Sequence, residues 1–532
     1  MMTTSATSMT AERILEDEYN KTPYQSFPFS HTHPTHLFTL ATLFGLKPKP
    51  VEKARILEIG CASGGNLIPI GYHFPTSECL GIDISEKQID DGIKQLVDMD
   101  IKNVTLRHQS LLEFDTKDGK FDYIICHGVY SWVDNEARRK ILQICHDNLS
   151  KNGIAYISYN TFPGWNMVNS VRALMMWHTK NIANPAEKAS QARSVLKFIG
   201  DGLQEDKSPY ATFLRNEIQL LSMHADSYLL HEHLSSYNDP VYFHQFMDQA
   251  NQAKLSYLAD AFLSLMFTEN LPPQFASELK KINNIVTTGQ YMDFIRNQRF
   301  RCTLLCHQEQ QINRSLKTVD IENFYLQFTG KTDRLNLSER DVGQDDISFS
   351  NAAVTLKLRN SLSQLAMVIL YQEQFKPMHY KELCEQMMLR SSTKDLAFIK
   401  HHLNEELNLM RTVLAGLINI SSYPGDYQLT LTEKPTACPY ARYQATFQQF
   451  ATNRRHQAIR LDPLGKSLLP LLDGTHALPD LINHAFSEVK AGRLNLLDKD
   501  KRPITDEELV RQQLKMACEN VLNNFAKQAL LV

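Results

Sequence analysis

The sequence lacks any long apolar run and any strong excess of one charge. No stretch approaches the roughly 18 consecutive apolar residues of a membrane helix, and the start MMTTSATSMT has neither the basic residues nor the apolar segment of a secretory signal. The formal net charge is −3, which does not favour a nucleic-acid backbone or an anionic membrane as the main partner. We therefore expect a cytoplasmic protein with no membrane insertion and no nucleic-acid partner, unless it is secreted by a route that leaves no such signal.

Cysteine patterns typical of a disulfide framework or a metal site are also missing. The nine cysteines are scattered and odd in number, and many lie in apolar segments such as FDYIICHG, which favours reduced thiols. Cys302, Cys306 and His307 form a C-x3-C-H pattern, but no second ligand pair follows at a suitable distance. We expect no bound metal.

The chain does have enough apolar material for several domains. Its 532 residues, 43% of them apolar, exceed what one hydrophobic core usually organises. We expect an aromatic lid segment, a cofactor-binding domain, a helical middle domain and a mixed α+β C-terminal region. Their predicted bounds are 1–50, 51–165, 166–317 and 318–532.

The second of these segments alternates β-branched runs with helical patterns, which predicts a Rossmann-like α/β domain with a parallel sheet. The predicted strands are 54–60, 78–84, 103–109, 121–127 and 153–160. The predicted helices are 65–74, 86–98 and 135–149, the last ended by the turn SKNG at 150–153. Beyond residue 166 helical patterns dominate, with few strand signals, to about residue 311. A helix–turn–helix with a β-wing at 426–432 would explain the segment 361–432.

The motif LEIGCASGGN (57–66) carries the clearest chemical signal, because it lies where the first strand should turn into the first helix. Small residues let the backbone approach a ligand closely, and a helix N-terminus offers free N–H groups. The loop alone is ambiguous, since Gly60, Ala62 and Gly65 also fit the dinucleotide fingerprint. Gly60, Ala62 and Gly64 match the methyltransferase spacing E-x-G-x-G-x-G, although alanine replaces the middle glycine. We therefore expect S-adenosylmethionine as the cofactor.

Two carboxylates flank this turn. Glu58 ends the first strand and is placed to hold the cationic amino-acid end of the cofactor, which a pyrophosphate would oppose. Asp83 ends the second strand, where a carboxylate offers paired acceptors for the ribose hydroxyls. The alternative for Asp83 is capping of the next helix, but Ser85 supplies that cap in the pattern SEKQ, three residues before Gln88.

The adenine end of the predicted site departs from the usual pattern. Many methyltransferases place an acid after the third strand, and here Gln109 and Ser110 occupy those positions, offering weaker acceptors. We expect Ser110, Ile84 and Leu111, together with His127 after the fourth strand, to contact the cofactor.

Several segments together resemble the rickettsial-type protein lysine methyltransferases. They are TPYQSFPFSHTHP (22–34), LEIGCASGGNLIPI (57–70), FDYIICHGVYSWV (121–133) and SYNTFPGW (158–165). The resemblance continues through residues 229–261, which are similar to the methyltransferase regulatory domain, then through 290–307 and LLPLLDGTHALPDL (468–481), so it covers most of the chain. It implies a class I methyltransferase domain, a helical middle domain and a C-terminal domain acting on protein lysines as a homodimer. Members of this family usually carry glutamine where His31 stands.

Candidate catalytic residues follow the fourth strand. Tyr130 and Trp132 lie at the carboxyl edge of the sheet, where such folds bind ligands, and His127 precedes them. Aromatic rings and a dry pocket would favour a neutral lysine amine, whose ordinary pKa is about 10.4. The alternatives are packing of Tyr130 and Trp132 against the following helix, and a hydrogen-bonded core role for His127.

The aromatic leader offers a lid over the cofactor. Tyr19, Tyr24, Phe27 and His33 are expected to cover the site, with Tyr24 and His33 touching the cofactor, because an open sheet edge would leave it wet. The alternative is packing of these side chains on the domain surface. The tripeptide His231–His233 lacks the i, i+4 histidine pair of a helical metal site, which favours a structural role.

Three functional alternatives stay open at this point. The chain fits a small-molecule or other protein-residue methyltransferase, since nothing in 54–160 selects the acceptor. It also fits a cofactor-binding module without turnover, which Ala62 and Ser110 permit, and an NAD oxidoreductase, which the loop ambiguity permits.

Overall fold

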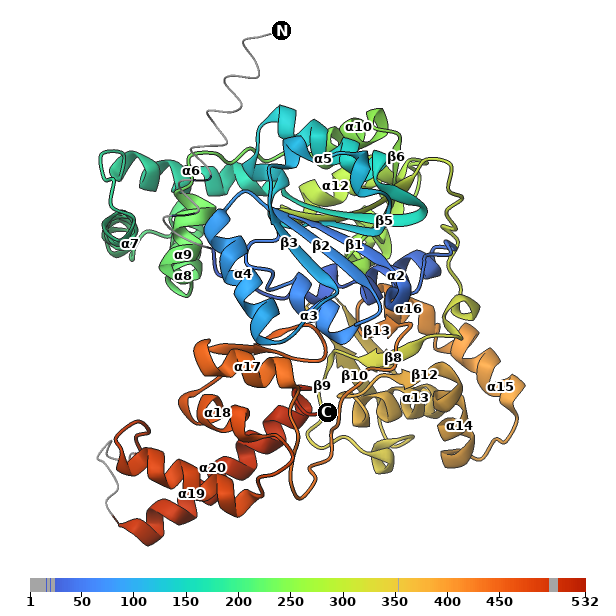
Figure 1. The fold of residues 1–532 in the computed structure, drawn as a ribbon. Coiled ribbons are helices and arrows are strands. Elements are labelled where there is room, and N and C mark those ends of the chain that lie inside the picture. Colours follow the sequence, from blue (N-terminus) through green and yellow to red (C-terminus); the bar gives the residue numbers. More distant parts are fainter. Residues whose placement is uncertain (1–15, 17–19, 21–23, 353, 497–505) are drawn as a thin grey trace.

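A seven-stranded sheet forms the centre of the upper part of the molecule (Figure 1). The computed structural model describes residues 16, 20, 24–352, 354–496 and 506–532. The strand order is β3-β2-β1-β4-β5-β7-β6, and every strand is parallel to its neighbours except β7, which is antiparallel to both β5 and β6. The strands are β1 (Arg55–Ile59), β2 (Glu78–Asp83), β3 (Val104–His108), β4 (Phe121–Cys126), β5 (Leu149–Asn160), β6 (Leu255–Asp260) and β7 (Phe300–His307).

Helices cover both faces of this sheet (Figure 1). One face carries a leader helix and the two helices that follow β1 and β2, and the other face packs on α5 and α10. Each predicted strand and helix of 54–160 is present within a few residues. The helices are α2 (Pro34–Leu43), α3 (Leu67–His73), α4 (Glu86–Asp98), α5 (Asn135–Asp147) and α10 (Phe243–Gln252).

The turn predicted at 150–153 is wrong, because these residues belong to β5. The strand begins at Leu149, which pairs with Phe121, and the register then shifts before Tyr123 pairs with Ile154. The SKNG residues are accommodated as an irregularity inside the ladder, because Leu149 is buried and holds the strand start against β4.

The segment 166–317 is less helical than predicted, since it supplies β6 and β7. All but the two end residues of β7 are buried, Arg301 and Thr303 included, so its polar residues do not mark a solvent-facing side of a strand. Besides α10, the α-helices of this segment are α6 (Gly164–His178), α7 (Pro185–Gly202), α8 (Pro209–Ser222), α9 (Asp226–Tyr228), α11 (Pro273–Leu279) and α12 (Ile285–Arg296), with a π-helical turn, η6 (Leu229–His233).

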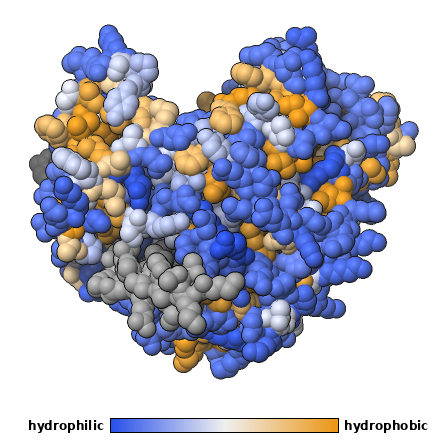
Figure 2. All heavy atoms as spheres, turned by 90° about the horizontal axis from the view of Figure 1, so that it is seen from above, coloured by the Kyte–Doolittle hydropathy of each residue, from blue (hydrophilic) through white to orange (hydrophobic). Residues whose placement is uncertain are grey.

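Helices α6 to α8 project from the body of the molecule (Figure 1). Large apolar side chains stand exposed on them, including Trp177, Phe198 and Tyr210. Figure 2 shows apolar side chains gathered on the lobe at the left, separated from the rest of that face by a hollow.

The C-terminal region packs below the sheet as two mixed units (Figure 1). The first has strands β8 (Tyr325–Phe328), β9 (Lys331–Thr332), β10 (Ile347–Ser350), β11 (Thr355–Leu358), β12 (Met378–His379) and β13 (Ile418–Ser421), and helices α13 (Ser361–Gln372), α14 (Tyr380–Arg390), α15 (Leu396–His401) and α16 (Leu409–Leu414). The wing strand predicted at 426–432 is irregular, and the strand that pairs with β8 is β13.

The second unit begins near residue 433. Its elements are α17 (Pro439–Phe447), β14 (Phe450–Thr452), β15 (Ala458–Arg460), α18 (Pro463–Leu468), α19 (Leu478–Lys490) and α20 (Glu507–Lys527). Strands β14 and β15 form a hairpin whose tip points back toward the sheet domain, where it contacts α3 and the leader. No helix in the described part of the chain is both long and apolar enough to cross a bilayer.

Candidate functional site

A cleft of about 250 Å³ opens at the carboxyl ends of β1, β2 and β4. This is where the strand order reverses, the position at which open α/β sheets bind their ligands. The leader, η6 and the start of β7 close the remaining sides. Of the predicted cofactor residues, those lining the cleft are Tyr24, Glu58, Gly60, Ala62, Asp83, Ile84, Leu111 and His127.

The turn after β1 has the sharp backbone that its small residues predicted. Gly60, Ala62 and Gly64 have φ of +73°, +49° and +75°, all in the left-handed region. A Cβ at Gly60 would lie 2.4 Å from Val129 Cγ2, so only glycine fits there. Gly64 lies beneath the turn against Ile68 and does not line the cleft.

The Asp83 carboxylate is fixed by the backbone on both sides. Oδ2 accepts a hydrogen bond from Ala62 N–H at 2.8 Å and Oδ1 accepts one from Ser85 N–H at 2.9 Å. Each oxygen keeps a second lone pair for another donor, as the two hydroxyls of a ribose provide. Ser85 caps α4 as predicted, because its side chain accepts from Gln88 N–H.

Glu58 is buried at the bottom of the cleft. Its Oε1 accepts a hydrogen bond from Asn66 Nδ2 at 2.7 Å, while Oε2 is buried without a hydrogen-bond partner among the described residues. Burial raises the pKa of Glu58 to about 8. A buried carboxylate oxygen without a donor needs a cation or a proton, so this atom fits the amino group of an amino-acid ligand.

The adenine end is built differently from the prediction at one residue. Gln109, Ile84 and Leu111 line the cleft. Ser110 is not among the described residues that line the cleft, and its hydroxyl caps the 3-10 turn Leu111–Glu113 by accepting from Leu112 N–H at 3.1 Å.

The predicted catalytic trio is divided. His127 and Trp132 line the cleft, and His127 Nδ1 is hydrogen-bonded to Tyr156 Oη at 2.9 Å. Tyr130 is fully buried and faces the core, where its hydroxyl donates to Gln249 of α10 and its ring packs edge-on against Phe246. The structure therefore packs Tyr130 in the core against α10, and the Arg138 guanidinium of the following helix α5 lies 5.1 Å from its ring centroid.

The leader covers the cleft with residues that sequence reasoning named only in part. Tyr24 and Phe27 line it, together with Ser26 and Phe29, and Tyr19 lies outside the described residues. His231 and Glu232 of η6, for which the sequence favours a structural role, also line the cleft. The Tyr24 and His231 rings meet edge-on at 5.3 Å, and burial raises the pKa of Glu232 to about 7.

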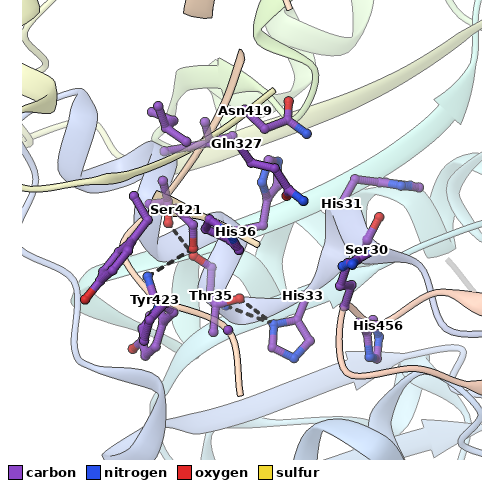
Figure 3. A pocket seen from close by; sticks show the side chains of 18 of the residues that line it. Ser30, His31, His33, Thr35, His36, Gln327, Asn419, Ser421, Tyr423 and His456 are labelled. Atoms are coloured by element: carbon purple, nitrogen blue, oxygen red, sulfur yellow. Dashed lines mark hydrogen bonds between the residues drawn. The ribbon is translucent and has the colours of Figure 1, made fainter. Parts of the chain in front are cut away.

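His33 does not reach the cleft. Its Nδ1 accepts from Thr35 N–H at the start of α2, and this capping directs the ring into a second cavity (Figure 3). That cavity measures about 650 Å³ and lies between the leader, the turn after β6 and both C-terminal units. Its lining includes His36, Gln327, Asn419, Tyr423 and His456 (Figure 3).

His31 stands between the two hollows. It lines the second cavity, yet its ring lies 5.4 Å from that of His127 in the cleft and 5.0 Å from that of Phe262. Its Nε2 is buried with no hydrogen-bond partner among the described residues, and burial lowers the pKa of His31 to about 4. The imidazole is therefore neutral, with a free nitrogen at the boundary.

The residues of the cleft fit an adenosyl amino acid. The unpartnered Glu58 Oε2 suits its ammonium group, the remaining lone pairs of Asp83 suit its ribose, and Ile84 and Leu111 offer apolar contact to its base. A pyrophosphate would meet the Asp83 carboxylate and no lysine or arginine among the described residues that line the cleft, which is unfavourable. In the described part of the chain, no group of three or more His, Cys, Asp or Glu residues is arranged to hold a metal ion.

Comparison with known proteins extends this description to most of the chain. Family models described as "Methyltransferase domain", "Predicted methyltransferase regulatory domain" and "PKMT, C-terminal winged helix domain" match residues 57–155, 225–307 and 433–530. The match to a winged helix thus covers residues 433–530, whereas the sequence pattern predicted a winged helix at 361–432.

Two relatives and one solved structure are similar over long stretches. The uncharacterized protein RP789 of Rickettsia prowazekii is 38% identical over 521 residues, which span 97% of this chain and 93% of that protein. The uncharacterized protein RP028 of the same organism is 50% identical over 234 residues, 44% of this chain and 94% of that protein. The structure of PKMT2 from Rickettsia typhi in complex with AdoHcy has a TM-score of 0.87 and 36% identity, and covers 96% of this chain and 100% of its own.

Proposed function

Because the chain belongs to the rickettsial PKMT family and is an S-adenosylmethionine-dependent methyltransferase, we propose that it methylates lysine side chains of a protein substrate. The family resemblance to protein lysine methyltransferases supports this acceptor. The observation that carries the proposal is the second cavity, because His31 in its wall is neutral, has no hydrogen-bond partner at Nε2 among the described residues and lies 5.4 Å from His127 of the cofactor cleft.

When bound, S-adenosylmethionine supplies an electrophilic methyl group on a sulfonium. The chain's own residues hold and orient the reactants: Asp83 accepts from the ribose, Glu58 faces the amino group, and Tyr24 and Phe27 exclude water. Gly60, Ala62, Ile84 and Leu111 complete the proposed cofactor contacts.

A lysine amine attacks only after it loses a proton. The boundary between the cavities is uncharged, because burial lowers the pKa of His127 to about 3 and of His31 to about 4. An uncharged, dry surrounding disfavours the ammonium form, and His31 Nε2 offers an acceptor that orients one amine N–H. The rings of Phe29, Phe300 and Trp132 supply the π faces next to the methylated product.

The decisive experiment incubates the protein with methyl-labelled cofactor and a bacterial lysate, then maps the labelled residue. We expect label on protein lysines, and strongly reduced label with the Asp83→Ala variant at a cofactor concentration below its Kd. Label on arginines, carboxylates or metabolites would instead support another class of methyltransferase. Cofactor binding with no transfer to any component would support a binding module without turnover.

A calorimetric titration separates the cofactors, with binding expected for S-adenosylmethionine and none for NAD. The homodimer implied by the resemblance remains a prediction. Sedimentation equilibrium tests it, and a second copy would cover the exposed apolar side chains on α6 to α8.

A further inference from the structure

The hairpin of the last C-terminal unit ends in a rigid tip at residues 453–457. Asn453 Oδ1 accepts from Arg455 N–H at 3.0 Å and from Gln457 N–H at 2.8 Å, and its Nδ2 donates to Gln528 O at 2.7 Å. Arg454 N–H also donates to Ala529 O at 2.9 Å. The tip is therefore anchored to the end of the chain, and the position of its side chains is set by the C-terminal unit.

His456 points from this tip into the sheet domain. It is only 3% exposed and has a left-handed φ of +57°. Its ring lies 4.7 Å from that of His33, and its Nε2 lies 2.7 Å from Asn66 Oδ1, across 390 positions of the chain. Nearby, Phe450 of β14 packs against Phe27, which lines the cofactor cleft, with ring centroids 4.7 Å apart.

The hydrogen bonds around Asn66 fix which way its amide faces. Phe29 N–H donates to Oδ1 at 3.0 Å, so this atom is the oxygen, and Nδ2 donates to Glu58 Oε1 at 2.7 Å. The imidazole of His456 must then donate through Nε2–H. The hydroxyl of Thr32 lies 3.1 Å from Asn66 Oδ1 and 2.9 Å from Phe29 O. It has a single proton, and the shorter distance favours donation to Phe29 O.

We propose that His456 is a positioning residue for the cofactor, acting through Asn66 to orient the carboxylate of Glu58. Nε2–H of His456 holds the amide of Asn66, the amide holds Glu58 Oε1, and Oε2 is left facing the cleft. The C-terminal unit is thereby part of the cofactor site. The inference concerns cofactor binding alone, so it stands or falls independently of the proposed lysine acceptor.

Two variants of the full-length protein distinguish the role of His456 as a hydrogen-bond donor from its role in the backbone turn. In His456→Asn the side-chain amide reaches only the position of Nδ1, although asparagine tolerates the left-handed backbone well. In His456→Gln the amide nitrogen reaches the position of Nε2, although glutamine is strained at this φ. If His456 only shapes the turn, His456→Asn should bind the cofactor better than His456→Gln. If His456 acts as the donor to Asn66, His456→Gln should bind it better.

The readout is the Kd for S-adenosylhomocysteine by calorimetry, with melting temperatures measured alongside. We expect a Kd about 5- to 10-fold higher for His456→Asn, because one buried hydrogen bond contributes about 1 kcal/mol. For His456→Gln we expect a Kd within about twofold of the parent. The control His476→Asn, in the same unit and away from the cleft, should leave the Kd unchanged.

An unchanged Kd for His456→Asn would overturn the proposal. Equal weakening by both variants, or weaker binding by His456→Gln than by His456→Asn, would also overturn it, because either result assigns the effect to the turn and not to the donor.

Discussion

The amide of Gly65 donates a hydrogen bond to Ser26 Oγ at 2.8 Å, which ties the leader to the turn after β1. A Cβ at Gly65 would lie 2.6 Å from the carbonyl oxygen of Ser26, so the two segments touch through their backbones. The leader is thus held on the cofactor cleft by a glycine that carries no chemistry of its own.

The variant Gly65→Ala tests this contact. The added methyl must displace the leader, which removes Tyr24 and Phe27 from the cleft, so we expect the Kd for S-adenosylhomocysteine to rise at least about 10-fold. Gly202→Ala is the matched control, because a Cβ there meets nothing within 4 Å. Equal affinity of the two variants would show that the leader does not contribute to binding.

Removal of the Asp83 carboxylate should weaken cofactor binding more strongly. Asp83→Ala loses both acceptors for the ribose, and we expect the Kd to rise at least about 30-fold, since hydrogen bonds to a charged group contribute about 1.5–3 kcal/mol each. Titration calorimetry measures the change, with the exposed Asp90→Ala in α4 as control. An unaltered Kd in Asp83→Ala would remove the ribose assignment.

Glu58 predicts a proton release on cofactor binding. With its pKa raised to about 8, the carboxyl is largely protonated at pH 7, and a cationic amino group beside it favours the ionised form. Calorimetry at pH 7 in two buffers of different ionisation enthalpy should therefore report close to one proton released per site. Glu58→Gln should release none and bind more weakly. Equal proton release by the variant would place the titrating group elsewhere.

The same shift predicts a gain in stability for Glu58→Gln without ligand. The pKa of Glu58 is higher in the folded chain than the ordinary 4.5, so the folded state binds the proton more tightly and stability falls as the pH rises from about 4.5 to about 8. The variant lacks this loss. We expect its melting temperature to exceed the parent's at pH 7.5 and the difference to shrink toward pH 5. A constant difference across this range would contradict the shift.

Substitutions at Tyr130 and Trp132 should have different effects on the rate of methyl transfer. Tyr130→Phe loses the hydrogen bond to Gln249, which costs about 1 kcal/mol of stability, but its ring stays in the core and transfer should be unchanged. Trp132→Leu alters the wall of the cleft and should lower kcat/KM. Initial rates of methyl transfer measure both. A large loss of kcat in Tyr130→Phe alone would return Tyr130 to the catalytic group.

Local pattern was enough to predict the part of the site that follows β1 and β2. Small residues at positions 60–65 predicted the sharp turn. Asp83 came at the end of an apolar run, and Ser85 had the spacing of a helix cap. These features depend on neighbours a few residues apart, so they leave a trace in the sequence.

The remaining walls come from distant segments that leave no such trace. His456 reaches Asn66 across 390 positions, and His231 and Glu232 enter the cleft from a π-helical turn that resembles any amphipathic helix. Ser110 and His33, which the sequence assigned to the cofactor, each cap a helical turn in the structure, and neither is among the described residues that line the cleft.

The position of β7 between β5 and β6 bears on how the protein is synthesised. A nascent chain that has left the ribosome only as far as α6 contains β1 to β5. The edge of β5 that later pairs with β7 is then unpaired, and an unpaired strand edge promotes aggregation. That edge is covered only when residue 307 emerges, about 150 residues after β5 begins. Expression of the first domain as a fragment ending near residue 165 should therefore yield inclusion bodies, whereas a fragment ending beyond 307 carries all seven strands.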